Sequence, residues 1–129
     1  MTIRWGVIGA TGFAGKRPLP GLAKAGNCQL HAVLKHNTDA GEVAREFAAA
    51  VVYDEQEALL ADPDVDAVYI CTPVFLHAAQ TVAAADAGKH VLVEKPMALT
   101  IDECRQMTDA CKGNDVKLQI GYMRRFHPY

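Results

Sequence analysis

A segment rich in glycine and other small residues near the N-terminus has the composition of a phosphate-binding turn. It reads Gly9-Ala10-Thr11-Gly12-Phe13-Ala14-Gly15 and lies between a short apolar stretch and a stretch of helical character. Small residues let the backbone approach a pyrophosphate, and the N–H groups at a helix start attract its charge. We therefore expect a dinucleotide to be bound by Gly9, Ala10, Thr11, Gly12, Phe13 and Ala14. Thr11 stands where a second glycine is usual, so its side chain either crowds the pyrophosphate or donates a hydrogen bond to it.

The end of the second apolar stretch bears on which dinucleotide is preferred. In sheets that bind NAD, an acidic residue usually stands at this point and accepts a hydrogen bond from the ribose 2′-hydroxyl. This chain has Lys35, His36 and Asn37 instead. A lysine attracts a 2′-phosphate, protonated His36 adds charge, and Asn37 offers a hydrogen bond. The segment predicts a preference for NADP over NAD, with a solvated Lys35 and a ribose held by Asn37 or Thr38 as the alternative.

The elements that position these segments alternate along the chain. We expect strands at Ile3–Ile8, Gln29–Leu34, Val51–Tyr53, Ala67–Cys71, His90–Val93 and Lys117–Met123. We expect helices at Gly12–Ala25, Thr38–Ala49, Glu55–Ala61, Leu76–Ala87 and Thr100–Lys112, the last with a capping box at its start. Strands and helices in alternation form right-handed crossovers and a parallel sheet. The predicted fold class is α/β, a doubly wound, mainly parallel sheet of about six strands (a Rossmann fold) in a single domain.

Composition and charge exclude several other classes of protein. The 129 residues are 50% hydrophobic and 22% charged, which is typical of a globular domain with one core. The net charge is −2, so we expect no general nucleic-acid binding. No apolar run reaches the about 18 residues that span a bilayer, and no signal segment is recognisable, so we expect a cytoplasmic protein without a membrane partner. The four cysteines lack C-x-x-C spacing, so no metal site is expected.

Two further segments resemble a known family. Residues 58–73 read A-L-L-A-D-P-D-V-D-A-V-Y-I-C-T-P, and residues 87–96 read A-G-K-H-V-L-V-E-K-P. With the string G-Y-M-R-R-F at residues 121–126, they resemble the nucleotide-binding domain of the Gfo/Idh/MocA family of NAD(P)-dependent oxidoreductases. The resemblance runs from Ile3 to Pro128. It implies hydride transfer between a nicotinamide cofactor and the hydroxyl or carbonyl group of a sugar, polyol or related small molecule.

The resemblance also implies roles for single residues. Four residues are expected to lie against the nicotinamide half of the cofactor: Thr72, Pro73, Leu76 and His77. Lys95 is expected to be the catalytic residue, which polarises or deprotonates the reacting hydroxyl. Glu94 is expected beside the cofactor and its ribose, and Pro96 is expected to shape the turn. Two alternatives stay open: Lys95 is a surface lysine paired with Glu94, or His77 caps the helix that it begins.

Members of this family are much longer than this chain. In them a second domain supplies most of the substrate pocket and the usual homo-oligomer interface, so residues 1–129 are expected to be either an excised domain or a stand-alone module. Because hydride transfer needs its reactants held within about 3–3.5 Å, the chain is expected to bind cofactor with little or no turnover. A non-catalytic NADP(H)-binding sensor is the alternative function. Other Rossmann reductases rank third, because the chain lacks Tyr-x-x-x-Lys and Cys71 is predicted to lie in a buried strand.

Overall fold

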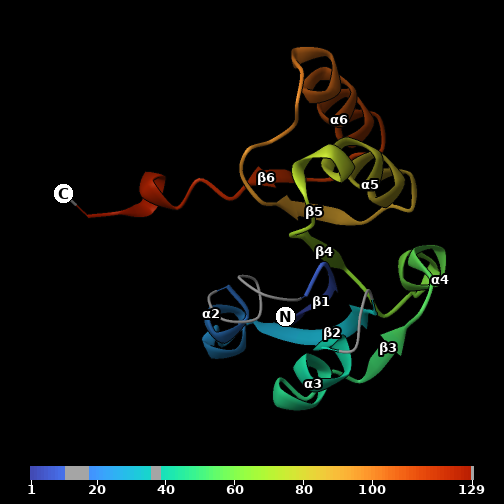
Figure 1. The fold of residues 1–129 in the computed structure, drawn as a ribbon, viewed down its shortest axis with the longest axis vertical. Helices are drawn as coiled ribbons and strands as arrows, with labels where there is room; N and C mark the ends of the chain where they lie inside the picture. The colour runs from blue at the N-terminus through green and yellow to red at the C-terminus, as the bar shows by residue number, and fades with distance from the viewer. Residues whose placement is uncertain (11–17, 36–38, 129) are drawn as a thin grey trace.

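A parallel sheet forms the centre of the protein (Figure 1). The computed structural model describes residues 1–10, 18–35 and 39–128. Within these ranges the strands are β1 (Ile3–Ile8), β2 (Cys28–Leu34), β3 (Val51–Tyr53), β4 (Ala67–Ile70), β5 (His90–Val93) and β6 (Leu118–Ile120). Their order across the sheet is β3-β2-β1-β4-β5-β6, and all neighbours run parallel. This is the strand order of a doubly wound dinucleotide-binding sheet, so the predicted fold class is confirmed.

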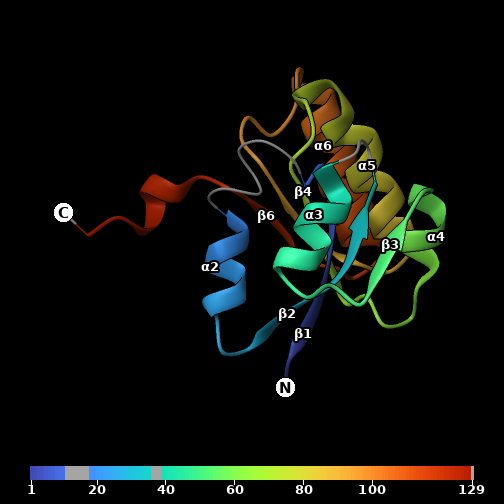
Figure 2. The same ribbon diagram turned by 60° about the horizontal axis from the view of Figure 1, so that its bottom comes forward.

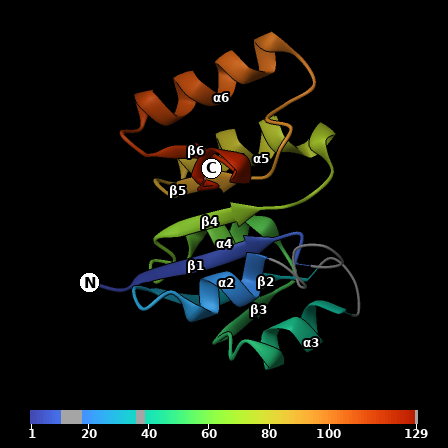
Figure 3. The ribbon, with the colours of Figure 1, turned by 90° about the vertical axis from the view of Figure 1, so that its left-hand side faces the viewer.

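The helices cover the two faces of the sheet in separate groups (Figure 3). One face carries α2 (Pro18–Lys24) and α3 (Asp39–Glu46). The other carries α4 (Gln56–Ala61), α5 (Val74–Asp86) and α6 (Ile101–Gly113). The short 3-10 helix η1 (Met123–Phe126) belongs to a C-terminal segment that runs away from the sheet (Figure 2). Among the described residues, no helix has the length and apolar character needed to cross a membrane.

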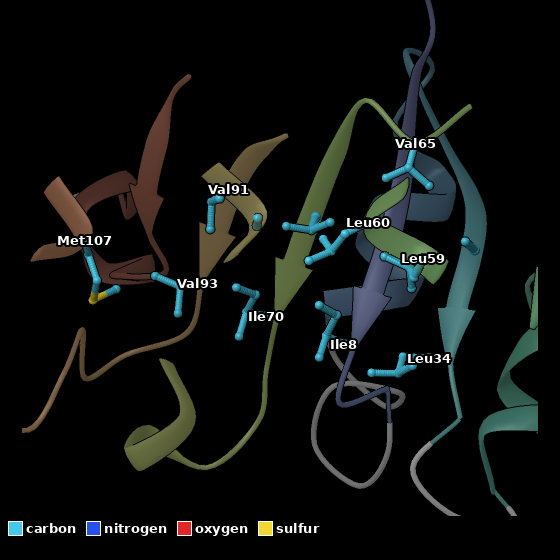
Figure 4. Packing of buried hydrophobic residues seen from close by; sticks show 12 residues of the cluster. Ile8, Leu34, Leu59, Leu60, Val65, Ile70, Val91, Val93 and Met107 are labelled. Atoms are coloured by element: carbon cyan, nitrogen blue, oxygen red, sulfur yellow. The ribbon is translucent and has the colours of Figure 1, made fainter. Parts of the chain in front are cut away.

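The larger hydrophobic core lies between the sheet and the group α4, α5 and α6. Figure 4 shows Ile8, Ile70 and Val93 side by side on the sheet, with Leu59 and Met107 among the helix residues that pack on them. Every residue of β4 is buried, because this strand has neighbours on both sides and packed side chains on both faces. The core therefore fixes the carboxyl ends of β1, β4 and β5 relative to one another.

The last strand differs most from the sequence prediction. It ends at Ile120 and not at Met123. The Tyr122 N–H donates to the Ile120 carbonyl oxygen at 2.8 Å, and the Met123 N–H donates to Gly121 at 3.1 Å, so the chain turns into η1. Tyr122 and Met123 are apolar enough to extend a strand pattern, but their side chains are 49% and 64% exposed. The other strand ends agree with the prediction to within one residue.

Helix starts follow local hydrogen bonding. At α6 the predicted capping box is confirmed, because the Thr100 side chain accepts from the Glu103 N–H and the Glu103 carboxylate accepts from the Thr100 N–H. For the predicted helix Gly12–Ala25, the structure gives α2 at Pro18–Lys24, and residues 12–17 lie outside the described ranges. Both prolines of α2 lie in its first turn, where backbone N–H groups have no partner inside the helix.

Lys89 is a charged residue buried at the start of β5, and we predict that it is needed for stability. Its side chain is 8% exposed, and Nζ donates to the carbonyl oxygens of Asp62 at 2.7 Å and Val65 at 2.8 Å. Lys89→Met keeps the length of the side chain but leaves these buried acceptors without the ammonium. We expect a loss of about 3 kcal/mol in the free energy of unfolding, measured by urea denaturation. The exposed Lys24→Met is the control, and equal unfolding midpoints for the two variants would contradict the prediction.

Candidate active site

The carboxyl ends of β1 and β4 approach each other closely at Gly9. This residue has φ +89°, and a Cβ there would lie 2.8 Å from the Thr72 backbone nitrogen and 2.9 Å from the Cys71 carbonyl carbon. Only glycine fits both the backbone angle and the space. The next residue, Ala10, is 1% exposed. Since β1 and β4 flank the point where the strand order reverses, the turn lies where doubly wound sheets bind their ligands. The other residues predicted for this turn lie outside the described ranges: Thr11, Gly12, Phe13 and Ala14.

The Cys71 thiol joins the two strand ends. Its Sγ lies 3.0 Å from the carbonyl oxygen of Gly9 and 3.3 Å from that of Ile8, and these two oxygens share its single S–H donor. Burial, together with the nearby charge of Glu94, raises the pKa of this thiol to about 12. The side chain is therefore a protonated donor at neutral pH and not an activated nucleophile. This arrangement disfavours the cysteine chemistry of acyl-phosphate reductases.

The loop after β4 is ordered by two residues of α5. Thr72 is 9% exposed, and its hydroxyl donates to the Gln80 side-chain carbonyl oxygen at 2.5 Å. Pro73 is exposed and is the N-cap residue of α5, and the Leu76 N–H donates to the Pro73 carbonyl oxygen at 3.0 Å. The sequence indicated Thr72, Pro73 and Leu76. The structure places Thr72 beside Gly9, Pro73 at the N-cap of α5 and Leu76 in the first turn of α5. The sequence did not single out Gln80, whose role depends on the fold of the loop.

His77 connects the loop after β4 to the loop after β5. Its side chain is 1% exposed, and its ring nitrogens lie 2.9 Å from the Thr72 carbonyl oxygen and 2.9 Å from the Pro96 carbonyl oxygen. Both partners are acceptors. A neutral imidazole donates to one of them, and an imidazolium donates to both. In this arrangement the ring nitrogens of His77 face the backbone, so we expect it to act on a cofactor through the two loops.

The loop after β5 carries the carboxylate and the lysine singled out in the sequence. The Glu94 carboxylate accepts from the Tyr69 hydroxyl at 2.6 Å and from the Lys95 N–H at 3.2 Å. Gly121 lies against it, since a Cβ at that position would come within 3.2 Å of the carboxylate. Burial and then this hydrogen bond raise the pKa of Tyr69, so its hydroxyl stays a donor. The sequence did not indicate this hydrogen bond, because Tyr69 lies in an apolar run that predicts a core residue of β4.

Lys95 itself is exposed and precedes a cis peptide bond to Pro96. In the part of the chain that the structure describes, no carboxylate oxygen lies within 4.0 Å of its Nζ. The lysine borders a mainly apolar cavity of about 490 Å³, whose wall also includes Tyr69, Glu94, Tyr122 and Phe126. A mainly apolar cavity lined by a few polar groups is typical of small-molecule sites.

Lys35 comes directly after β2, as the sequence predicted. Its Nζ lies 3.5 Å from Oδ1 of Asp54, which comes directly after the neighbouring strand β3. The predicted neighbours His36 and Asn37 lie outside the described residues. Asp54 was missed in the sequence, although its position after a strand was a usable signal. An acidic and a basic side chain therefore share the region where a Rossmann sheet contacts the adenosine ribose.

Comparison with known proteins identifies the family. Residues 3–122 match the family model described as an oxidoreductase family with an NAD-binding Rossmann fold. The chain is 38% identical over 124 residues to D-xylose 1-dehydrogenase (NADP(+)) 2 of Haloferax volcanii, covering 96% of this chain and 38% of that protein. It is 41% identical over 130 residues to an inositol 2-dehydrogenase/D-chiro-inositol 3-dehydrogenase of Shouchella clausii, covering 98% of this chain and 37% of that protein. The chain thus spans well under half the length of these relatives.

Comparison with solved structures leads to the same family. A 3-ketoreductase from Actinomadura kijaniata in complex with NADP superposes with a TM-score of 0.93 at 33% identity, covering 99% of this chain and 41% of that one. Scyllo-inositol dehydrogenase from Lactobacillus casei with bound NAD(H) and scyllo-inositol superposes with a TM-score of 0.89 at 29% identity, covering 98% and 38%. The fold, the glycine turn at the strand-order reversal and these matches lead to one assignment. This chain belongs to the Gfo/Idh/MocA family of oxidoreductases and forms its NAD-binding Rossmann domain.

Proposed function

We propose that this chain binds NADP(H) more tightly than NAD(H) and serves a dehydrogenase or reductase that acts on a sugar, polyol or related small molecule. The observation that carries the proposal is the turn at Gly9, which packs against Cys71 and Thr72 without room for a Cβ and lies at the carboxyl ends of β1 and β4, where doubly wound sheets bind dinucleotides. Lys35, placed at the end of β2, supplies a positive charge for a 2′-phosphate. The relatives named above as NADP- or NAD-linked enzymes support the substrate class.

In this proposal the residues around Lys95 perform the acid–base part of the reaction. When bound, the nicotinamide accepts or supplies the hydride. Lys95 Nζ hydrogen-bonds to the reacting oxygen of the substrate and takes or returns its proton. Glu94, which Tyr69 and the Lys95 N–H hold in place, orients the turn that carries the lysine. Thr72 and Pro73 would border the nicotinamide, and the mainly apolar cavity beside Lys95 would hold the substrate.

We also propose that this chain has little or no turnover without further protein. Hydride transfer requires donor and acceptor at about 3–3.5 Å in a defined orientation. The cavity has Lys95 and Glu94 among its polar lining residues, and the remaining contacts to a polyhydroxylated substrate would come from the region that the longer relatives have in addition. A robust dehydrogenase rate from the 129-residue chain would contradict this part of the proposal.

Titration with NADPH and with NADH tests the proposed cofactor preference. We expect NADPH to bind at least tenfold more tightly, which corresponds to about 1.4 kcal/mol, because Lys35 attracts the 2′-phosphate. Lys35→Asp is expected to reverse the order, and Lys112→Asp on α6 is the control for the same change in net charge. Fluorescence of the bound nicotinamide or calorimetry at fixed salt gives the dissociation constants. Equal affinities would show that Lys35 is only a solvated residue, and no binding of either cofactor would overturn the proposal.

A further inference from the structure

Beyond the role of Lys35, we infer that Asp54 limits how strongly this site distinguishes NADP(H) from NAD(H), an inference that rests on the proposed cofactor binding. The two side chains are brought together by the sheet. In the parallel pair β2–β3, Leu34 lies opposite Tyr53, so the next residue on each strand leaves the sheet at the same level. The Lys35 N–H donates to the Tyr53 carbonyl oxygen at 2.7 Å and continues this register.

Lys35 and Asp54 form an exposed ion pair. Lys35 Nζ lies 3.5 Å from Asp54 Oδ1, and the side chains are 54% and 78% exposed. Within the described residues, Asp54 is the only carboxylate within 4.0 Å of this ammonium. Exposed ion pairs of this kind contribute little to stability, so both side chains can turn toward a ligand. Their position matters because an acidic group near the end of β2 is the usual contact of the ribose 2′-hydroxyl.

Asp54 acts in opposite directions on the two cofactors. A 2′-phosphate that approaches Lys35 must displace the Asp54 carboxylate from the ammonium or share the ammonium with it. The phosphate and the carboxylate are both negative and repel each other. A 2′-hydroxyl is a neutral donor, and the Asp54 carboxylate can accept its hydrogen bond. Lys35 therefore favours NADPH while Asp54 favours NADH. With both residues present, we expect a moderate preference for NADPH over NADH. Lys35 without Asp54 would produce a strong one.

Neutralising Asp54 tests the inference. We measure the ratio of the dissociation constants of NADH and NADPH for the wild type and for Asp54→Asn. The ratio is expected to rise at least fivefold, mainly through tighter NADPH binding, and the rise is expected to shrink at high salt because the charges are exposed. Since the Asp54 side chain is 78% exposed and Lys35 is its one ion-pair partner among the described residues, the variant is expected to unfold at the wild-type urea concentration.

Asp102→Asn is the matched control. Asp102 is likewise an exposed carboxylate paired with a basic residue, Arg105 at 3.0 Å, and it lies on α6, near the opposite edge of the sheet from β3. We expect no change in the ratio for this variant. If Asp54→Asn leaves the ratio unchanged or lowers it, or if Asp102→Asn raises it equally, the inference is wrong and the proposed function stands. If the wild type binds neither cofactor, both are wrong.

Discussion

Gly9→Ala is expected to cost about 4 kcal/mol of the free energy of unfolding and to abolish cofactor binding. Two physical effects add at this residue. The backbone angle φ of +89° is unfavourable for a residue with a side chain, and the added methyl group would lie 2.8 Å from the Thr72 nitrogen and 2.9 Å from the Cys71 carbonyl carbon. Both clashing atoms belong to the backbone, so relief requires that the ends of β1 and β4 move apart. That movement would also break the hydrogen bond from the Cys71 N–H to the Ile8 carbonyl oxygen.

Two control substitutions separate the effects at Gly9. Gly88 has φ +73° but nothing within 4 Å of its added Cβ, so Gly88→Ala measures the cost of the backbone angle without a clash, about 1 kcal/mol. Gly113, at the end of α6, has neither feature, and Gly113→Ala is expected to be neutral or slightly stabilising. Urea denaturation and NADPH titration measure the three variants. A Gly9→Ala protein with the unfolding midpoint of Gly88→Ala would show that the strand ends are not packed this closely.

The turn at Gly9 was predictable from the sequence because its residues are adjacent in the chain. The strands around it were also predictable, since apolar, β-branched runs are bounded by turn residues at places such as Ile3–Ile8 and His90–Val93. The strand β6 was predicted too long because Tyr122 and Met123 continue an apolar pattern that only the exposure of these residues in the fold corrects. Local pattern thus locates the elements better than it locates their ends.

The contacts that organise the candidate site were not predictable in the same way. Tyr69 and Glu94 are 25 residues apart, and only the pairing of β4 with β5 places the hydroxyl 2.6 Å from the carboxylate. Lys35 and Asp54 likewise depend on the register of β2 and β3. A parallel sheet brings together residues that follow neighbouring strands, so the residue directly after each predicted strand is the place to search once a strand order is assumed. That rule would have found Asp54 but not Tyr69, which lies inside its strand.

His77, which the sequence analysis places against the nicotinamide half of a bound cofactor, contacts two loops in the structure. Its ring nitrogens face the carbonyl oxygens of Thr72 and Pro96 at 2.9 Å each. These carbonyls belong to the two loops that would border the nicotinamide and carry Lys95. If His77 positions both loops, its loss should weaken NADPH and NADH to the same extent, because β1 separates β4 and β5 from β2, at whose end the 2′ group is proposed to bind. Changes at Lys35 or Asp54 should instead alter the ratio of the two affinities.

His77→Phe is expected to weaken both cofactors at least tenfold and to lower the free energy of unfolding by about 3 kcal/mol, since the phenyl ring fills the space but donates neither to the buried Thr72 carbonyl oxygen nor to the part-buried Pro96 carbonyl oxygen. Titrations are made at a temperature where the variant is folded, as checked by circular dichroism. His90→Phe is the control, because His90 is exposed on β5 and its ring accepts a hydrogen bond from the Lys117 N–H at 3.1 Å. Wild-type affinity in His77→Phe would show that the loops hold their positions without the imidazole. A loss confined to NADPH would place His77 near the 2′-phosphate, contrary to the geometry in which it joins the loops after β4 and β5.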